Sequence, residues 1–358
     1  MQKKDTHKTA LHEKKGVSPS EITNSKSISN IKGKRKTQPS TKELIHGIIN
    51  EDITALSRAI TLVESKNLKH LEKANTIINA CLPKANNSVR IGITGVPGVG
   101  KSTFIEAFGK HLTRLGKKVA VLAIDPSSTI TKGSILGDKT RMEDLVKDRK
   151  AFIRPSASGD SLGGVARKTR ETIILCEAAG FDTIIIETVG VGQSETAVHS
   201  MVDFFLLLKL AGAGDELQGI KRGIIEMADA IVINKADGDN IKRAKLAKVE
   251  FNRALQLYPD KDSKWNPKVS LCSALHQEGI NEIWEMILEY ITLTKENNFF
   301  ETKRNEQNKF WLIQTIEEQL KTDFFNRTEI KKELKKQLQL IEKNETTPFT
   351  AAEYLLSL

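Results

Sequence analysis

Short apolar runs alternate with longer stretches at helical spacing from Arg90 to Leu275. Several runs are continuous in Val, Ile and Leu, as expected of strands buried on both faces. This alternation predicts an α/β fold with a mostly parallel, doubly wound sheet, whose ligand lies at the carboxyl ends of its strands. The expected strands are 90–94, 118–124, 151–154, 183–187, 203–210, 230–234 and 268–272, and the expected helices are 102–115, 163–179, 222–228, 240–257 and 279–295.

Helical patterns flank this region. A capping box, in which Ser40 is followed three residues later by Glu43, predicts the start of the first helix. Further helices are expected at about 53–64 and 68–81. We therefore divide the chain into a basic disordered tail (1–39), an N-terminal helical region (40–85), a nucleotide-binding domain (86–295) and a C-terminal helical region (296–358).

The C-terminal region carries two apolar helical stripes, formed by Phe310, Ile313, Ile316 and Leu320 and by Leu334, Leu338 and Ile341. Such stripes need a surface to pack on. That surface is either a second subunit or the chain's own domain. The apolar last residues, 349–358, are expected to dock on other elements.

The net charge of +10 is concentrated in the tail, because residues 1–40 hold ten Lys or Arg and only three Asp or Glu. The rest is close to neutral, and aromatic residues are only 5% of the chain, so we expect no nucleic-acid partner. No apolar run is long enough to span a membrane. The tail lacks the apolar segment of a secretory signal peptide. We interpret it as a disordered cytoplasmic segment, and the alternative is a presequence for the mitochondrial matrix. The three separated cysteines predict neither a zinc site nor disulfides.

A phosphate-binding motif follows the first expected strand. Residues 95–102 read Gly-Val-Pro-Gly-Val-Gly-Lys-Ser, a complete G-x-x-x-x-G-K-[ST] sequence between a strand and a helix. Its glycines let backbone N–H groups surround phosphates, Lys101 supplies a charge, and Ser102 offers its hydroxyl to Mg²⁺. The predicted contact residues are Gly95, Val96, Pro97, Gly98, Val99, Gly100, Lys101, Ser102 and Thr103.

A guanine-reading motif follows a later strand. Asn234, Lys235 and Asp237 form Asn-Lys-x-Asp after the run Ile-Val-Ile. The Asp237 carboxylate can accept two hydrogen bonds from guanine, whereas adenine has no matching donor pair and would leave it unpaired. Ser273, Ala274 and Leu275 end another apolar run and resemble the last guanine-contacting loop of GTPases. The combination favours GTP over ATP.

Candidate metal and switch residues also follow strand ends. Glu187 ends a buried strand, with Gly190 three residues later, where common GTPases have Asp-x-x-Gly. Glu187 is placed to hold Mg²⁺, and the Gly190 N–H is placed to meet the γ-phosphate. Asp125 and Asp138 could also reach the metal. On spacing alone, either could equally be a surface carboxylate.

With these motifs the chain resembles the MeaB/ArgK/MMAA family of G-proteins over about residues 41–340. The runs most specific to that family are Arg-Ala-Ile-Thr-Leu-Val-Glu-Ser (58–65), Ile-Leu-Gly-Asp-Lys-Thr-Arg-Met (135–142) and Gly-Asp-Glu-Leu-Gln-Gly-Ile-Lys (214–221). The resemblance implies a homodimeric GTPase that uses GTP, GDP and Mg²⁺ and dimerises through its C-terminal helices.

The resemblance also implies a client, adenosylcobalamin-dependent methylmalonyl-CoA mutase. Members of the family act as chaperones that gate cofactor loading and protect this mutase. Residues 214–223 match the family's third switch, in which Lys221 is expected to contribute to hydrolysis once the client is bound. Gln193 is a candidate for orienting the attacking water by chemical analogy. With Lys101, these residues make up the predicted catalytic set.

Two other functional classes remain as alternatives. A metal-delivery G-protein of the nickel-chaperone type would need Cys or His ligands near the nucleotide domain, and His111, His199 and His276 are isolated in the sequence. A transport-linked kinase would need a base and a pocket for an acceptor. The sequence indicates neither feature.

Overall fold

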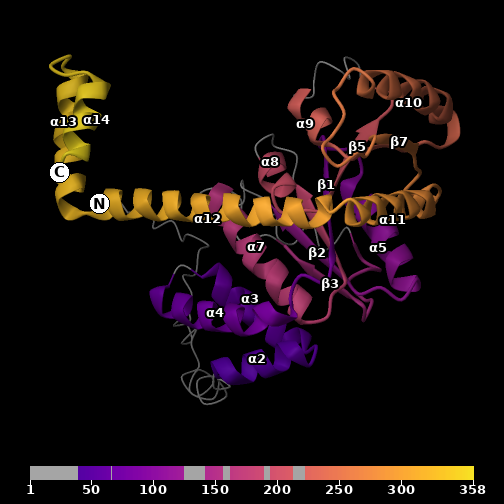
Figure 1. Ribbon diagram of the computed structural model, residues 1–358, viewed down its shortest axis with the longest axis horizontal. Coiled ribbons are helices and arrows are strands. Elements are labelled where there is room, and N and C mark those ends of the chain that lie inside the picture. The colour runs from indigo at the N-terminus through magenta and orange to yellow at the C-terminus, as the bar shows by residue number, and fades with distance from the viewer. Residues whose placement is uncertain (1–38, 66, 125–141, 156–161, 189–193, 213–221) are drawn as a thin grey trace, which may run out of the picture. The chain divides into compact units, whose positions relative to one another are not determined.

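A computed structural model describes residues 39–65, 67–124, 142–155, 162–188, 194–212 and 222–358, and Thr41–Leu358 form one unit. Its centre is a parallel sheet, in which seven strands are described in the order β3-β2-β4-β1-β5-β6-β7 (Figure 1). The predicted fold class and the seven predicted strands are confirmed. The strands are β1 (Val89–Gly95), β2 (Val119–Ile124), β3 (Ala151–Arg154), β4 (Thr183–Thr188), β5 (Phe204–Leu210), β6 (Ala230–Asn234) and β7 (Lys268–Leu271).

Helices cover both faces of the sheet, because successive residues of each strand point to opposite sides. On β4, Ile184 and Ile186 face one apolar core and Ile185 faces another. The first core contains α7 (Leu162–Ala178) and α8 (Ser194–His199); the second contains α5 (Lys101–Arg114) and α11 (Ile280–Glu296). A third core joins α9 (Arg222–Met227) and α10 (Ile241–Leu255) to β5, β6 and β7. The sequence pattern did not predict α8, which is only six residues long.

Three N-terminal helices pack against α7. They are α2 (Thr41–Ile49), α3 (Ile53–Glu64) and α4 (Leu68–Cys81), followed by the short 3₁₀ helix η1 (Leu82–Lys84). The helix α2 begins directly after Ser40, where the capping box placed it. Asp52 caps α3 by accepting a hydrogen bond from the Thr54 N–H, and Asn67 caps α4 in the same way. Their buried side chains, including Leu56 and Ile60, join the first core.

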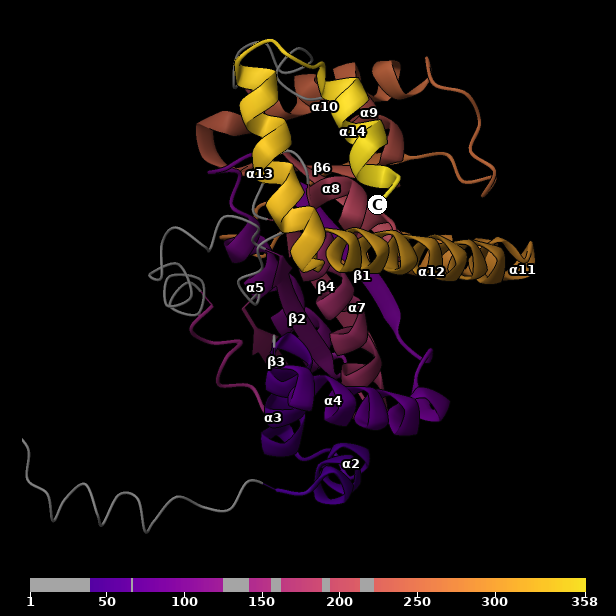
Figure 2. The same ribbon diagram turned by 90° about the vertical axis from the view of Figure 1, so that its left-hand side faces the viewer.

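The C-terminal region is helical, as predicted, and consists of α12 (Phe299–Asn326), α13 (Thr328–Glu342) and α14 (Pro348–Leu356). Figure 2 shows α13 and α14 side by side beyond the end of α12. The first half of α12 packs on the sheet domain, whereas the predicted stripe on its second half is open. Leu320 is 64% exposed and Ile313 is 53% exposed. The stripe therefore does not fold back on the described part of its own domain.

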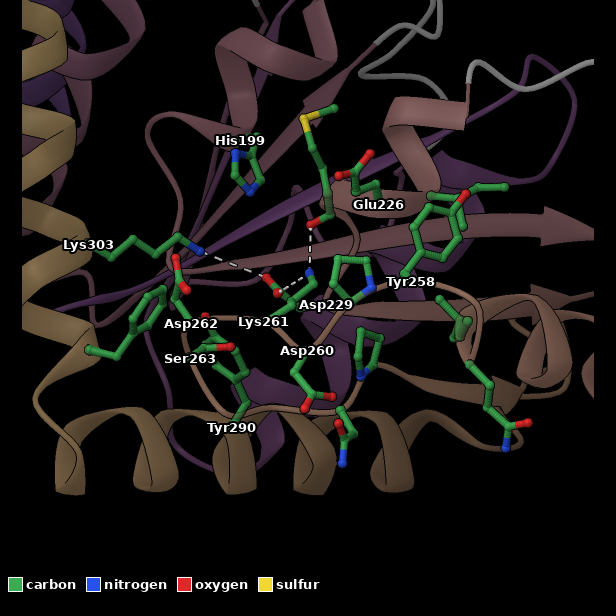
Figure 3. A pocket seen from close by; sticks show the side chains of 18 of the residues that line it. His199, Glu226, Asp229, Tyr258, Asp260, Lys261, Asp262, Ser263, Tyr290 and Lys303 are labelled. Carbon is green, nitrogen blue, oxygen red and sulfur yellow. Dashed lines mark hydrogen bonds and ion pairs between the residues drawn. The ribbon is translucent and has the colours of Figure 1, made fainter.

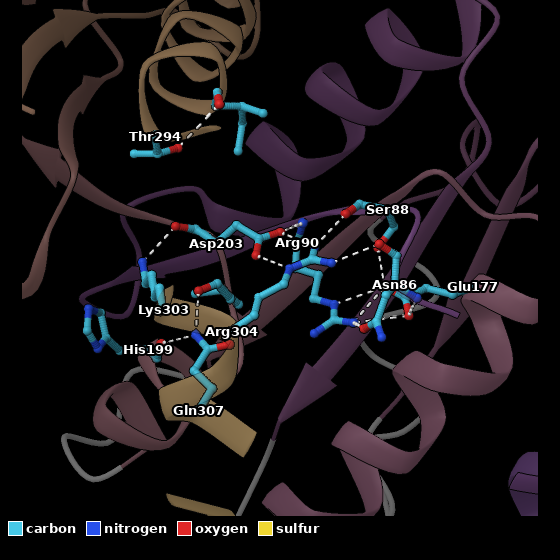
Figure 4. A network of polar contacts seen from close by, with 12 residues as sticks. Asn86, Ser88, Arg90, Glu177, His199, Asp203, Thr294, Lys303, Arg304 and Gln307 are labelled. Atoms are coloured by element: carbon cyan, nitrogen blue, oxygen red, sulfur yellow. Dashed lines mark hydrogen bonds and ion pairs between the residues drawn. The ribbon is translucent and has the colours of Figure 1, made fainter. Parts of the chain in front are cut away.

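Buried ion pairs attach α12 to the amino edge of the sheet (Figure 4). The Arg304 guanidinium donates two hydrogen bonds of 2.8 Å to the Asp203 carboxylate and two more to the carbonyls of Asn86 and Ser88. Beside it, Arg90 pairs with Glu177 of α7 at 2.9 Å. Each of these four buried charges thus has a counter-charge, which is the condition for tolerating charges in an apolar interior.

Three further side chains of α12, spaced four residues apart, hold the turn between α8 and β5. Lys303, Gln307 and Trp311 donate to the carbonyls of Asp203 (2.7 Å), Val202 (2.9 Å) and Ser200 (3.0 Å), respectively. Because residues at this spacing share one face of a helix, a single face of α12 satisfies the carbonyls of this turn.

Among the described helices, none has the length and apolarity that crossing a bilayer requires.

The ring of His199, at the end of α8, makes stability depend on pH. Burial, together with the nearby Lys303 charge, lowers its pKa from 6.5 to about 4. An unfolded chain would protonate this ring below pH 6.5, while the folded protein resists protonation until about pH 4. The stability is therefore complete above pH 6.5 and is lost as the pH falls towards 4.

We expect wild-type protein to lose about 2 kcal/mol more unfolding free energy between pH 7.5 and 5.0 than the His199→Phe variant, measured by urea denaturation. Phe keeps the ring that packs edge-on against Phe205. A His46→Gln variant, altered at an exposed site on α2, is the control and should behave like wild type. Equal pH dependence of wild type and His199→Phe would refute the assignment.

Candidate functional site

The predicted phosphate loop joins β1 to α5 at the carboxyl edge of the sheet. Gly98 (φ 82°) and Gly100 (φ 90°) adopt left-handed backbone conformations that side chains disfavour. Lys101 begins α5, so the positive end of the helix dipole faces the loop. Its ammonium donates to the carbonyls of Gly95 at 2.7 Å and Val96 at 3.3 Å. This loop can therefore surround an anion with N–H groups and one fixed cation.

Asn234, at the end of β6, connects the predicted guanine motif to this loop through hydrogen bonds. Its side-chain N–H donates to the Val99 carbonyl at 2.9 Å. Its side-chain oxygen accepts from the Ala274 N–H at 3.2 Å and from the Cys272 thiol at 3.5 Å. Asn234 is buried, so all of these contacts are shielded from water. One amide thus connects three loops that are far apart in the sequence.

Lys235 and Asp237 continue the same arrangement. The Lys235 ammonium donates to the Gly98 carbonyl at 3.0 Å, a second link between the motif and the phosphate loop. The Ser273 hydroxyl donates to the half-buried Asp237 carboxylate, which holds that carboxylate in place. The turn is closed by hydrogen bonds from the Ala236 N–H to the Cys272 carbonyl (3.0 Å) and from the Asn240 side chain, in the 3₁₀ helix η2 (Gly238–Asn240), to the Lys235 carbonyl (2.7 Å).

The predicted guanine-contacting loop after β7 lies at the same edge. Ala274 is buried under Asn234, while Leu275 is 75% exposed. Sequence reasoning missed Cys272 as a member of this site. Burial and the neighbouring Asp237 charge raise the pKa of its thiol to about 12. It therefore acts as a neutral donor to Asn234. Its position directly before the Ser-Ala-Leu loop was the available signal.

Two candidate metal ligands also lie at this edge. Glu187 is buried at the end of β4, which pairs in parallel with β1 so that Glu187 lies opposite Ile93. Ser102 is half-buried in the first turn of α5, which follows β1. A carboxylate and a hydroxyl are hard oxygen donors of the kind that Mg²⁺ prefers, so these residues fit the metal. The Thr188 hydroxyl donates to the Thr94 hydroxyl at 2.8 Å and joins the two strands beside them.

The remaining predicted residues lie outside the described part of the chain. They are Asp125, Asp138, Gly190, Gln193 and Lys221. The structure brings together the phosphate loop, the Asn-Lys-x-Asp motif, the Ser-Ala-Leu loop and Glu187. The roles of the five other residues stay predictions from motif and family resemblance.

Comparisons with known proteins bear on this site. The family model described as "Methylmalonyl Co-A mutase-associated GTPase MeaB" matches residues 56–329. The GTPase ArgK of Escherichia coli is 45% identical over 313 residues, which are 87% of this chain and 95% of that protein. A mouse protein, "Methylmalonic aciduria type A homolog, mitochondrial", is 43% identical over 331 residues, covering 90% of this chain and 80% of its own length. The crystal structure of a "LAO/AO transport system kinase" superposes with a TM-score of 0.73 at 38% identity, covering 90% of this chain and 98% of that one.

The contact between Gly100 and Asn234 is open to a direct test. A Cβ at Gly100 would lie 2.8 Å from the Asn234 side-chain nitrogen, so Gly100→Ala should push that amide off the Val99 carbonyl. We expect affinity for GTP, measured by calorimetry, to fall by at least about ten-fold.

The matched control for this variant is Gly116→Ala. Gly116 has nearly the same φ, 89°, but a Cβ there meets nothing within 4 Å. It should show the backbone strain of about 1–2 kcal/mol in unfolding experiments and unchanged GTP affinity. If Gly100→Ala bound GTP as tightly as Gly116→Ala, the close approach would have no bearing on the site.

Proposed function

The chain belongs to the MeaB family of methylmalonyl-CoA mutase-associated GTPases, and on that basis we propose that it chaperones an adenosylcobalamin-dependent methylmalonyl-CoA mutase. In this role GTP binding and hydrolysis would gate cofactor loading and protect the mutase from inactivation. The family name supports the client; the loading and protecting steps are our proposal. The assignment of the protein as a P-loop GTPase does not depend on the identity of its client.

The proposed nucleotide site is supported by one observation above all. Asn234 and Lys235 donate hydrogen bonds directly to the phosphate loop. A single nucleotide can therefore contact the loop with its phosphates and the Asp237 carboxylate with its base. We propose that Asp237 accepts two hydrogen bonds from guanine, with Ser273 fixing the carboxylate and Ala274 and Leu275 lying along the ring. Adenine would leave this half-buried carboxylate without donors, which disfavours ATP.

At the phosphate end, we assign the triphosphate to the Lys101 ammonium and to the backbone N–H groups from Gly95 to Thr103, except Pro97, which has none. Ser102 and Glu187 would hold Mg²⁺, together with Asp125 and Asp138. A bound Mg²⁺ would neutralise the charge that builds up on the phosphates during transfer. Gly190 would contact the γ-phosphate through its N–H, which makes its loop sensitive to hydrolysis.

We further propose that the client completes the catalytic site. Lys221 would supply a cation to the transition state once the mutase is bound, and Gln193 would orient the attacking water. Cations supplied in this way raise GTPase rates by roughly 10³ to 10⁵. The intrinsic rate should accordingly be slow.

A homodimer is proposed for the C-terminal helices. Exposed apolar side chains lie on α12 and α14, including Leu312 (61%), Leu320 (64%) and Phe349 (81%), and a group of exposed apolar side chains is typical of an interaction surface. A second copy would bury them. The proposed cytoplasmic location stays a prediction, because the basic tail on which it rests lies outside the described residues.

The base assignment is tested by Asp237→Asn. An amide can donate to the 2-carbonyl of xanthine but cannot accept both guanine donors. We expect GTP affinity to fall by about 100-fold and affinity for xanthosine triphosphate to rise, measured by calorimetry. Asp239→Asn removes an exposed carboxylate two residues away and should change neither value. Undiminished preference for GTP in Asp237→Asn would contradict the assignment.

The client and the third switch are tested together by steady-state phosphate release with and without the mutase. Wild type should be stimulated by the mutase, and Lys221→Ala should lose most of that stimulation while keeping its GTP affinity. Lys242→Ala, altered at an exposed lysine of α10, is the control and should retain it. Absence of stimulation in wild type would reject the client, whereas full stimulation of Lys221→Ala would reject only the role of that lysine.

A further inference from the structure

The outer face of α10 carries a line of four exposed side chains, Lys242, Leu246, Val249 and Arg253. Leu246 is 66% exposed and Val249 is 48% exposed, and neither is part of the described apolar cores, whereas Phe251 of the same helix is. The four residues are separated by four, three and four positions, so they share one face of the helix. This is the spacing of the seam along which two helices pack.

The same helix carries an excess of positive charge. Its five basic side chains and one acidic side chain are Lys242, Arg243, Lys245, Lys248, Arg253 and Glu250. None of the six forms an ion pair with another residue that the structure describes. Lys245 lies three positions from both Lys242 and Lys248, and like charges at this spacing repel each other on a helix. Carboxylates from outside the chain would relieve this repulsion.

Charges are arranged differently in the cavity beside the end of α10 (Figure 3). There the Lys261 ammonium donates to the Asp229 carboxylate at 2.9 Å, and Lys303 lies 3.8 Å from the same carboxylate. These two lysines thus have a counter-charge within the fold. The cations of α10 have none among the described residues, so they are available to a partner.

We propose that the outer face of α10 binds an acidic amphipathic helix of another protein. Leu246 and Val249 pack against the apolar line of that helix, and the surrounding cations pair with carboxylates beside it. An anionic membrane fits less well, because helices that lie in a bilayer present a broad apolar face, and here only two apolar side chains lie between the cations of the line. This partner is separate from the proposed mutase client.

Binding is tested by fluorescence anisotropy on the full chain with a labelled helical peptide of about three heptads, which has leucine at positions a and d and glutamate at e and g. Its glutamates repel one another and keep it from pairing with itself. A second peptide has lysine in place of every glutamate. We expect the acidic peptide to bind at least about ten-fold more tightly than the basic one, and to lose affinity as salt is added. Failure of the acidic peptide to bind, or equal binding of the two peptides, overturns the proposal.

A pair of variants assigns the binding to this face. Leu246→Gln removes the exposed apolar side chain but keeps a good helix former, and should weaken binding of the acidic peptide by about ten-fold. Leu71→Gln, at a leucine of α4 that is 40% exposed, is the matched control and should bind the peptide normally. Both variants retain the basic tail, so the difference between them reports on α10 alone. Both should keep the GTP affinity and thermal stability of wild type, and unchanged peptide binding in Leu246→Gln overturns the proposal.

Two other occupants of this face are separated by further measurements on wild type and Leu246→Gln. We expect both proteins to bind vesicles of phosphatidylcholine and phosphatidylserine equally, and to sediment with the same mass. Weaker vesicle binding by Leu246→Gln would assign the face to a membrane, and a lower mass of this variant would assign it to a second copy of the chain. Either result overturns the proposal.

Discussion

The geometry of the nucleotide site depends on one buried side-chain amide, that of Asn234. Its N–H reaches the phosphate loop through Val99, and its oxygen receives the N–H of Ala274. Because leaving this buried amide unpaired would cost free energy, its hydrogen bonds fix the positions of the three loops relative to one another. If these loops bind the nucleotide as proposed, the spacing between its phosphate contacts and its base contacts is set by the protein before the nucleotide arrives, which would reduce the entropy cost of binding.

The sequence predicted the parts of this molecule that depend on local pattern. All seven strands appear where the apolar runs placed them. The central strands β4 and β6 are buried along their whole length, as their continuous apolar runs predict. The phosphate and guanine motifs were also predictable, since each needs a fixed local order of residues. The six-residue helix α8 was not, because so short a segment has no helical period to detect.

Contacts between distant segments could not be predicted from the sequence, for a different reason. The position of Cys272 directly before the Ser-Ala-Leu loop places it near the site but does not reveal that its thiol meets Asn234. Nothing near Arg304 reveals its pairing with Asp203, 101 residues earlier. Such pairs arise from the crossing of elements in three dimensions.

The two edges of the sheet hold their cations in different ways, and at the proposed nucleotide site this difference would affect exchange. At the amino edge Arg304 is locked to a carboxylate. At the carboxyl edge the Lys101 ammonium donates to neutral carbonyls of its own loop, those of Gly95 and Val96. A phosphate that binds Lys101 as proposed would have to compete with these dipoles, and on leaving it would free an ammonium that has acceptors already in reach. In the proposed site the ammonium would therefore keep acceptors within reach whether or not phosphate is bound, so exchange of the product would not leave its charge without a partner.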